Sequence, residues 1–156
     1  MAEGDSIRLT IRQVADYEFS VRFEDTDLPE LGVDESPPIG KGRGPDPSRL
    51  LAAAVGNCLA ASLLFALRKH RNTPGPIVVD ARLSIVRNAE GRLRVGGISV
   101  DLRLAEAAAT HTRVESLLAQ FENFCIVTES VRAGIPVDVR VVDATGATVH
   151  ASSAHP

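Results

Sequence analysis

The stretch Leu50–Leu67, LLAAAVGNCLAASLLFAL, is the most apolar part of this sequence, and the rest of the chain is interpreted around it. Asp46, just before it, offers an N-cap oxygen, and Pro47 suits the first position of a helix. Basic residues follow the stretch, and Pro74-Gly75-Pro76 then prevents a helix from continuing. The pattern therefore predicts a long buried helix from Pro47 to about His70 at the centre of a globular domain.

A membrane span is the alternative interpretation of the same stretch. Its 18 residues reach the lower limit for crossing a bilayer, and basic residues flank it on both sides. Eight of the 18 residues are small or polar, however, and alanine contributes little to membrane insertion. The remaining chain also alternates apolar and polar residues as half-buried strands do. A buried helix without a membrane partner is therefore the prediction.

Composition limits the possible functions further. With 156 residues the chain fits one domain, 1–156, whose core is built from Ala, Val, Leu and Ile because only 4% of residues are aromatic. A net charge of −3 argues against a nucleic-acid partner, since phosphate binding needs a concentrated basic surface. The two cysteines lack zinc-ligand spacing, so no metal is expected. The N-terminus MAEGDSIRL lacks an apolar signal core, which predicts a cytoplasmic protein.

The other segments predict a mixture of helices and strands. Ala105–Phe121 is predicted to form a second helix, and a short helical piece is predicted after Cys125, ending at Gly134. The Pro- and Gly-rich segment 24–44 is expected to be a long loop, and 144–156 a frayed tail. Alternating patterns predict strands at Ser6–Arg12, Tyr17–Phe23, Ile77–Val86, Arg92–Leu104 and Ile135–Val142. The predicted fold class is α+β.

Several side chains have simple expected roles. His70 and His111 are expected at the surface near helix ends, and Glu129 and Arg132 are spaced to form a local ion pair. Cys58, taken alone, reads as a small core residue of an Ala-rich helix. Cys125, however, lies in a second unusual segment, and two cysteines in two such places suggest thiol chemistry.

Two segments carry a resemblance to a known family. Residues 45–63, PDPSRLLAAAVGNCLAASL, contain a proline followed eleven positions later by a cysteine, which are Pro47 and Cys58. Residues 124–141, FCIVTESVRAGIPVDVRV, combine a cysteine, a short polar helix, a glycine and a strand. Both segments resemble the motifs of the OsmC/Ohr family, the osmotically induced protein C and organic hydroperoxide resistance proteins. The order of elements agrees from about Ile7 to Val142.

The resemblance implies both a fold and an activity. The fold would be an α+β intertwined homodimer in which antiparallel sheets wrap around two long central helices. The activity would be that of an antioxidant peroxidase for organic hydroperoxides, with Cys58 as the peroxidatic and Cys125 as the resolving cysteine. The cycle would use no metal, haem or other cofactor, and a dithiol reductant of the lipoyl or thioredoxin type would complete it. These thiols, 67 positions apart in sequence, would have to come within disulfide reach.

Activation of Cys58 needs a cation. A free thiol titrates at about 8.5, and burial among apolar residues raises that value. In the family an arginine of the N-terminal sheet supplies the charge and is held by a glutamate just after the helix-start proline. Here Ser48 and Arg49 follow Pro47 instead. Three candidates for the activating cation therefore remain open: Arg12, Arg22 and Arg49.

A second function is compatible with the same resemblance. The chain could be a non-catalytic or redox-sensing OsmC-like protein that binds a small hydrophobic ligand at the dimer interface. The missing glutamate favours this alternative, and the presence of both cysteines favours the peroxidase.

Overall fold

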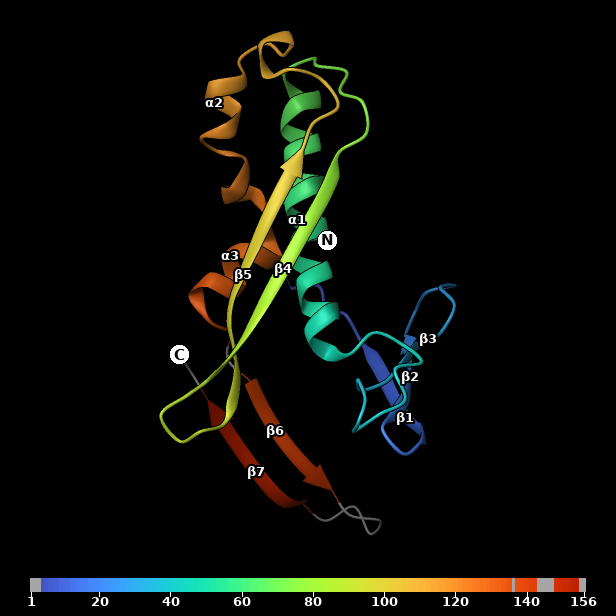
Figure 1. Ribbon diagram of the computed structural model, residues 1–156. Coiled ribbons are helices and arrows are strands. Elements are labelled where there is room, and N and C mark those ends of the chain that lie inside the picture. The colour runs from blue at the N-terminus through green and yellow to red at the C-terminus, as the bar shows by residue number, and fades with distance from the viewer. Residues whose placement is uncertain (1–3, 136, 143–147, 155–156) are drawn as a thin grey trace. The chain divides into compact units, whose positions relative to one another are not determined.

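Two compact units make up the chain, and each combines two separate segments of sequence. The computed structural model describes residues 4–135, 137–142 and 148–154 (Figure 1). One unit contains residues 1–53 and 82–99, and the other contains residues 54–81 and 100–156. Three elements run from one unit into the other: α1 (Pro47–Lys69), β4 (Val78–Arg87) and β5 (Leu93–Arg103). The single domain expected over 1–156 stays a prediction.

The first unit contains a three-stranded antiparallel sheet, drawn in blue in Figure 1. Its strands are β1 (Leu9–Ala15), β2 (Glu18–Phe23) and β3 (Leu31–Val33), in the order β1-β2-β3. The strands expected at Ser6–Arg12 and Tyr17–Phe23 are confirmed, and they pair in antiparallel fashion as β1 and β2. The prediction of a loop throughout 24–44 is wrong for β3, which pairs with β2. Three residues are too few to carry a periodic signal, so only pairing with β2 makes this segment a strand.

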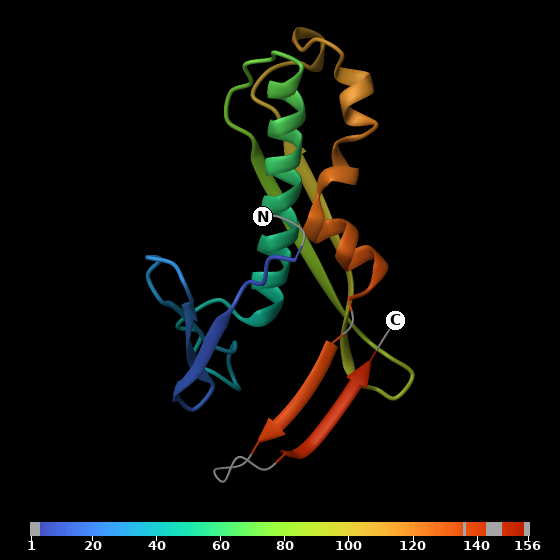
Figure 2. The same cartoon turned by 180° about the vertical axis from the view of Figure 1, so that it is seen from behind.

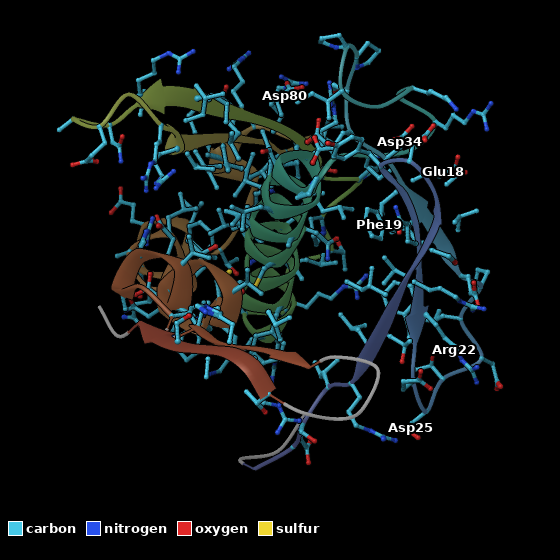
Figure 3. All side chains as sticks on the ribbon, turned by 90° about the horizontal axis from the view of Figure 1, so that it is seen from below. Glu18, Phe19, Arg22, Asp25, Asp34 and Asp80 are labelled. Atoms are coloured by element: carbon cyan, nitrogen blue, oxygen red, sulfur yellow. The ribbon has the colours of Figure 1, made fainter. Side chains whose placement is uncertain are left out.

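A buried carboxylate shapes the loop that leads to α1. Asp34 accepts hydrogen bonds from the backbone N–H groups of Lys41 and Arg43, at 3.0 and 3.1 Å. The hydrogen bond from Arg43 has the largest effect, and together these bonds lower the pKa of Asp34 although burial opposes them. A cavity of about 580 Å³ lies beside this loop, and Glu18, Phe19 and Asp34 are among its lining residues (Figure 3). Lys41 and Asp16 both line this cavity and form an ion pair with each other.

Helix α1 begins where the sequence predicts. Asp46 Oδ1 accepts the backbone N–H of Arg49 at 2.9 Å, which is an N-cap bond, and Pro47 is the first helical residue. Phe65, 61% exposed, lies outside the buried stripe of the helix. By length and composition α1 could cross a membrane, a test that the core helix of a soluble protein also passes, and 33% of its most apolar window is buried. The buried residues are Val55, Gly56, Leu59, Ser62, Leu63 and Leu67.

Strands β4 and β5 pair as a two-stranded sheet. The turn between them is closed by the backbone bonds from Gly91 N to Asn88 O, 2.9 Å, and from Asn88 N to Arg92 O, 3.0 Å. Gly91 has a φ of +74°, which favours glycine at this position. The strands expected at Ile77–Val86 and Arg92–Leu104 are therefore confirmed.

The second helix predicted over Ala105–Phe121 is wrong. The segment instead forms one short 3₁₀ turn, η1 (Ala108–Thr110), and one short helix, α2 (Val114–Leu118). A second 3₁₀ turn, η2 (Phe121–Phe124), begins at its last residue. Arg113 has a φ of +55° and interrupts the helical backbone immediately before α2. The apolar spacing was nevertheless informative, because Leu117 and Phe121 are buried.

Contacts with the end of α1 explain why this segment is not one helix. The side chain of Asn72 accepts the N–H of Thr112 at 2.8 Å and donates to the C=O of Thr112 at 3.2 Å. These bonds take the backbone groups that a continuous helix would need. Glu106 accepts the N–H of Gly75 at 2.8 Å and lies 3.7 Å from His111. His111 is 9% exposed, so its predicted surface position is wrong.

The C-terminal part forms α3 (Ile126–Ala133) and the antiparallel strands β6 (Val137–Val142) and β7 (Thr148–Ala154). The hairpin is drawn in orange and red in Figures 1 and 2. The frayed tail expected over 144–156 is therefore wrong for β7, while residues 144–147 and 155–156 lie outside the described part. The small, polar sequence of β7 does not predict a strand, and pairing of its backbone with β6 is what makes it one. The α+β class with antiparallel sheets is confirmed.

Candidate functional site

Cys58 lies in the middle of α1 and is half-buried. Its neighbours Val55 and Leu59 belong to the buried stripe of the helix. The partial charge of a helix N-terminus falls off within the first turn, so Cys58 gains little from it. Apolar surroundings and a central position both disfavour a charged sulfur at Cys58.

Cys125 has a different environment, between η2 and α3. It is the N-cap residue of α3, and its Sγ accepts the backbone N–H of Thr128 at 3.4 Å. The Thr128 hydroxyl lies 2.9 Å from the same sulfur. Cys125 is 0% exposed and Thr128 is also buried. A helix N-terminus and its N–H groups favour the thiolate form of a cysteine.

The two thiols lie close enough within the second unit to shift each other's pKa. Ser62, one helical turn after Cys58 on the buried stripe of α1, also lowers the pKa of Cys125. The fold therefore brings the two cysteines near one another across 67 positions of sequence, and their approach within disulfide reach stays a prediction. Their catalytic roles stay predictions.

The environments shift the two thiols in opposite directions. Burial raises the pKa of Cys58, and its hydrogen bond to Cys125 raises it further, against backbone hydrogen bonds from Val127 and Thr128. Burial alone would also raise the pKa of Cys125, but hydrogen bonds from Cys58, Thr128 and Ser62 lower it below its ordinary value. Of the two thiols, Cys125 is therefore the one whose surroundings favour loss of the proton.

An ion-pair network fixes the turn that carries Cys125. Arg132 of α3 contacts Glu122 of η2 at 2.6 Å and Glu129 of α3 at 2.7 Å. The predicted Glu129–Arg132 pair is confirmed, and Glu122 extends it across the cysteine. Each exposed pair contributes little to stability, but the network joins the two elements on either side of Cys125.

Ser62 and Thr128 were missed as functional candidates from the sequence. A signal for each existed. Ser62 stands four positions after Cys58, which is one turn along a helix, and Thr128 stands three positions after Cys125, the spacing of an N-cap residue and its partner. The sequence does not show that the side chains of Ser62 and Thr128 both lie near the sulfur of Cys125.

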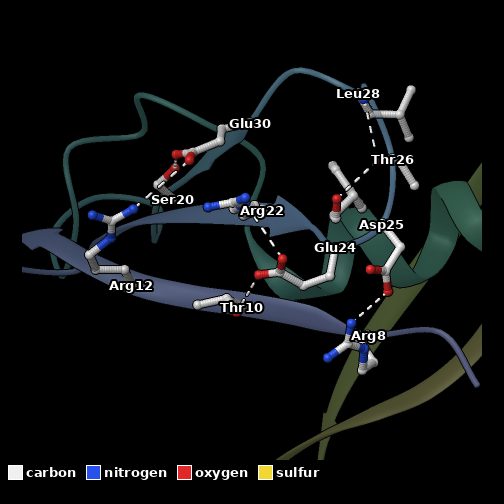
Figure 4. Close-up of polar contacts among 11 residues, drawn as sticks. Arg8, Thr10, Arg12, Ser20, Arg22, Glu24, Asp25, Thr26, Leu28 and Glu30 are labelled. Atoms are coloured by element: carbon white, nitrogen blue, oxygen red, sulfur yellow. Dashed lines mark hydrogen bonds and ion pairs between the residues drawn. The ribbon is translucent and has the colours of Figure 1, made fainter.

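The three candidate arginines all belong to the first unit, and each is paired with a carboxylate there. Arg12 lies 3.9 Å from Glu30, and Arg22 lies 3.6 Å from Glu24 (Figure 4). The third, Arg49, pairs with Asp46 at the start of α1. The activating role of any of the three stays a prediction.

Apolar space is available along α1 in the second unit. A cavity of about 470 Å³ is lined by Asn57, Ala60, Ala61, Leu64, Arg68 and the segment Pro74–Ile77. A smaller one of about 50 Å³ is lined by residues that include Phe65, Phe121 and Phe124. Within the described ranges, no group of three or more His, Cys, Asp or Glu side chains could hold a metal ion.

The family model for OsmC-like proteins matches residues 40–140, a range that includes both cysteine segments. This chain belongs to the OsmC family. None of the curated proteins matches the sequence.

Solved structures share the fold of this OsmC family chain at low sequence identity. An OsmC-like protein of unknown function from Vibrio cholerae is 13% identical with a TM-score of 0.66, covering 81% of this chain and 93% of its own. The organic hydroperoxide resistance protein OsmC of Legionella pneumophila is 14% identical with a TM-score of 0.65, covering 84% and 92%. OhrB of Bacillus subtilis, an organic hydroperoxide resistance protein, is 14% identical with a TM-score of 0.61, covering 82% and 91%. At such identities the likeness establishes the fold alone.

Proposed function

We propose that this OsmC family protein is a thiol peroxidase that reduces organic hydroperoxides through Cys58 and Cys125. The observation that carries the proposal is the closeness of two thiols that lie on separate elements and shift each other's pKa, one of them at a helix N-terminus where it accepts a backbone N–H. The names of the Legionella and Bacillus proteins support the substrate class. The cavity of about 470 Å³ along α1, whose lining includes Ala60, Ala61 and Leu64, suits the hydrocarbon part of such a peroxide.

The proposed cycle follows the chemistry of cysteine oxidation. The Cys58 thiolate attacks the terminal peroxide oxygen, the O–O bond breaks, and the alkoxide leaves and takes a proton to become an alcohol. Cys125 then attacks the sulfur of the Cys58 sulfenic acid, water leaves, and a disulfide forms. An external dithiol of the lipoyl or thioredoxin type returns both thiols.

The closeness of the two thiols offers a way to make Cys58 nucleophilic. The two groups titrate as a pair, so the relevant species is a monoanion with one shared proton. Moving this proton from Cys58 to Cys125 produces the Cys58 thiolate without burying a second negative charge. A cation, proposed to be Arg12, Arg22 or Arg49, would shift the shared proton in the same direction.

We further propose that one OsmC-like domain pairs with a second copy, as an intertwined homodimer with two long central helices, in the cytoplasm. Isolated two-stranded sheets such as β4-β5 and β6-β7 are marginally stable in water. The apolar residues Leu9, Ile11 and Val14 of β1 are 50–61% exposed, and Phe65 of α1 is 61% exposed. A second copy that covers these surfaces would complete the sheets and the core. A stable monomer in sedimentation at micromolar concentration would contradict the dimer.

A second candidate function is a non-catalytic or redox-sensing protein that binds a small hydrophobic ligand. The raised pKa of Cys58 favours it, because a protonated thiol attacks peroxides poorly. The two candidates differ in turnover. A sensor would be oxidised once and would not consume peroxide in the presence of a dithiol.

The test is consumption of cumene hydroperoxide and of hydrogen peroxide, with dithiothreitol or reduced lipoamide as electron donor. The proposal expects faster consumption of cumene hydroperoxide, and none with Cys58→Ser. Cys125→Ser should still complete the first oxidation, but its Cys58 should progress to sulfinic acid, detected by mass spectrometry. No consumption of either peroxide, with Cys58 alkylated no faster than a free thiol, would refute the peroxidase.

A further inference from the structure

The two cysteines of the pair are unequally exposed. Cys125 is 0% exposed, whereas Cys58 keeps part of its surface accessible. A thiol that enters from solvent and attacks a disulfide between them must approach one sulfur along the axis of the S–S bond. In this protomer Cys58 is the sulfur that can be approached.

The groups that stabilise negative charge are also unequally distributed. The backbone N–H of Thr128 reaches Cys125 at 3.4 Å, and the Thr128 hydroxyl lies 2.9 Å from it. Ser62 acts in the same direction, because it lowers the pKa of Cys125. Ser62 and Thr128 are both buried, so their hydroxyl groups are shielded from solvent. Cys125 is therefore placed to carry charge when an S–S bond breaks.

Thiol–disulfide exchange depends on both properties. The entering thiolate attacks the accessible sulfur, and the exchange is faster when the departing sulfur is a stable thiolate. Resting on the proposed peroxidase cycle, we propose that the external dithiol attacks the disulfide at Cys58, and that Thr128 and Ser62 hold Cys125 as the leaving thiolate. Both are positioning residues for the reduction half of the cycle.

The proposed step balances as follows. One thiolate of the dithiol bonds to Cys58 Sγ, the Cys58–Cys125 bond breaks, and its electron pair leaves on Cys125 Sγ. The second thiol of the reductant then loses its proton to water and attacks the reductant sulfur bound to Cys58. This releases Cys58, which takes up a proton, and the reductant leaves as its own disulfide.

The position of the mixed disulfide tests the proposal without peroxide. Wild-type protein is oxidised with diamide, mixed briefly with 2-mercaptoethanol, quenched with acid, labelled with N-ethylmaleimide and mapped by peptide mass spectrometry. We expect mercaptoethanol on Cys58 and maleimide on Cys125, with the reverse species at least about tenfold rarer. Mercaptoethanol mainly on Cys125, or equally on both, would overturn the inference. So would failure of diamide to form the disulfide.

Variants test the two hydroxyls. Thr128→Val keeps shape and the backbone N–H but removes the hydroxyl, and we expect the diamide-formed disulfide to be reduced by dithiothreitol about fivefold more slowly. Thr128→Ser should restore the rate of disulfide reduction, and Ser62→Ala should also slow it. Ser130→Ala, in the same helix as Thr128, should leave the rate unchanged. An unchanged rate in both Thr128→Val and Ser62→Ala would overturn the role of the hydroxyls. Peroxide consumption is measured separately, so loss of that activity with the expected mixed disulfide would refute only the proposed function.

Discussion

Asn72 offers the clearest test of how the second unit holds its cysteine segments together. Its side chain is 8% exposed and makes four hydrogen bonds, two with backbone groups of Thr112, one with Thr112 Oγ1 and one with the C=O of Leu67. Helix α1 carries Cys58, and these bonds join the residues at its C-terminal end to the segment that leads to Cys125. The perturbation is Asn72→Ala.

The magnitude follows from which groups lose a partner. The C=O of Leu67 keeps the backbone N–H of residue 72 at 3.0 Å, and Thr112 Oγ1 keeps the C=O of His70 at 3.0 Å. The N–H and C=O of Thr112, bonded at 2.8 and 3.2 Å, lose the amide that satisfied them. At about 1 to 1.5 kcal/mol for each such group, Asn72→Ala should lower the free energy of unfolding by about 2 to 3 kcal/mol.

The assay is urea unfolding at a fixed protein concentration, because self-association would otherwise shift the midpoint. Asn123→Ala makes the same chemical change at an exposed position and should cost less than about 0.5 kcal/mol. Asn72→Asp keeps the acceptor but turns a carboxylate toward two carbonyl oxygens, so its stability should increase as the pH falls and the new carboxyl is protonated. An Asn72→Ala variant no less stable than Asn123→Ala would refute the reasoning.

Three further predictions concern packing, acid stability and activation. A Cβ on Gly56 would lie 3.2 Å from Val79 Cγ1, so a large side chain does not fit there. Gly56→Leu should therefore lower the free energy of unfolding in urea by about 2 kcal/mol or more, and Gly56→Ala should lower it much less. The lowered pKa of Asp34 means that its contribution to stability is present above its ordinary pKa and disappears as the pH falls through the lowered value. The difference in melting temperature between wild type and Asp34→Asn should therefore shrink on acidification from neutral pH, and a constant difference would contradict this. Replacing the activating arginine by Ala should raise the pKa of Cys58, which is measured from the pH dependence of Cys58 alkylation, and should slow peroxide consumption. Rates equal to wild type in the Ala variants of Arg12, Arg22 and Arg49 would contradict activation by any of the three.

Local chemistry determined several features of this OsmC family protein from sequence alone. The Asp46 cap, the Pro47 start and the apolar run fix α1, since capping and burial act within a few residues. Alternation fixes the strands of the β1-β2 and β4-β5 hairpins, and Gly91 fixes the turn of the second. The two cysteine motifs indicated the family, which the match over residues 40–140 then established.

Contacts between distant segments decided the rest. The bonds of Asn72 with Thr112 break up a segment whose apolar spacing alone predicted a helix. Strands β3 and β7 exist through their partners, because a short or weakly patterned strand is stable only when its backbone is paired. The sequence suggested a reactive cysteine pair, but Ser62 and Thr128 meet at Cys125 only after α1 and α3 have packed. The pKa of a thiol depends on burial and on neighbours that folding brings from far along the chain, so the distribution of charge between Cys58 and Cys125 was decided by the tertiary structure.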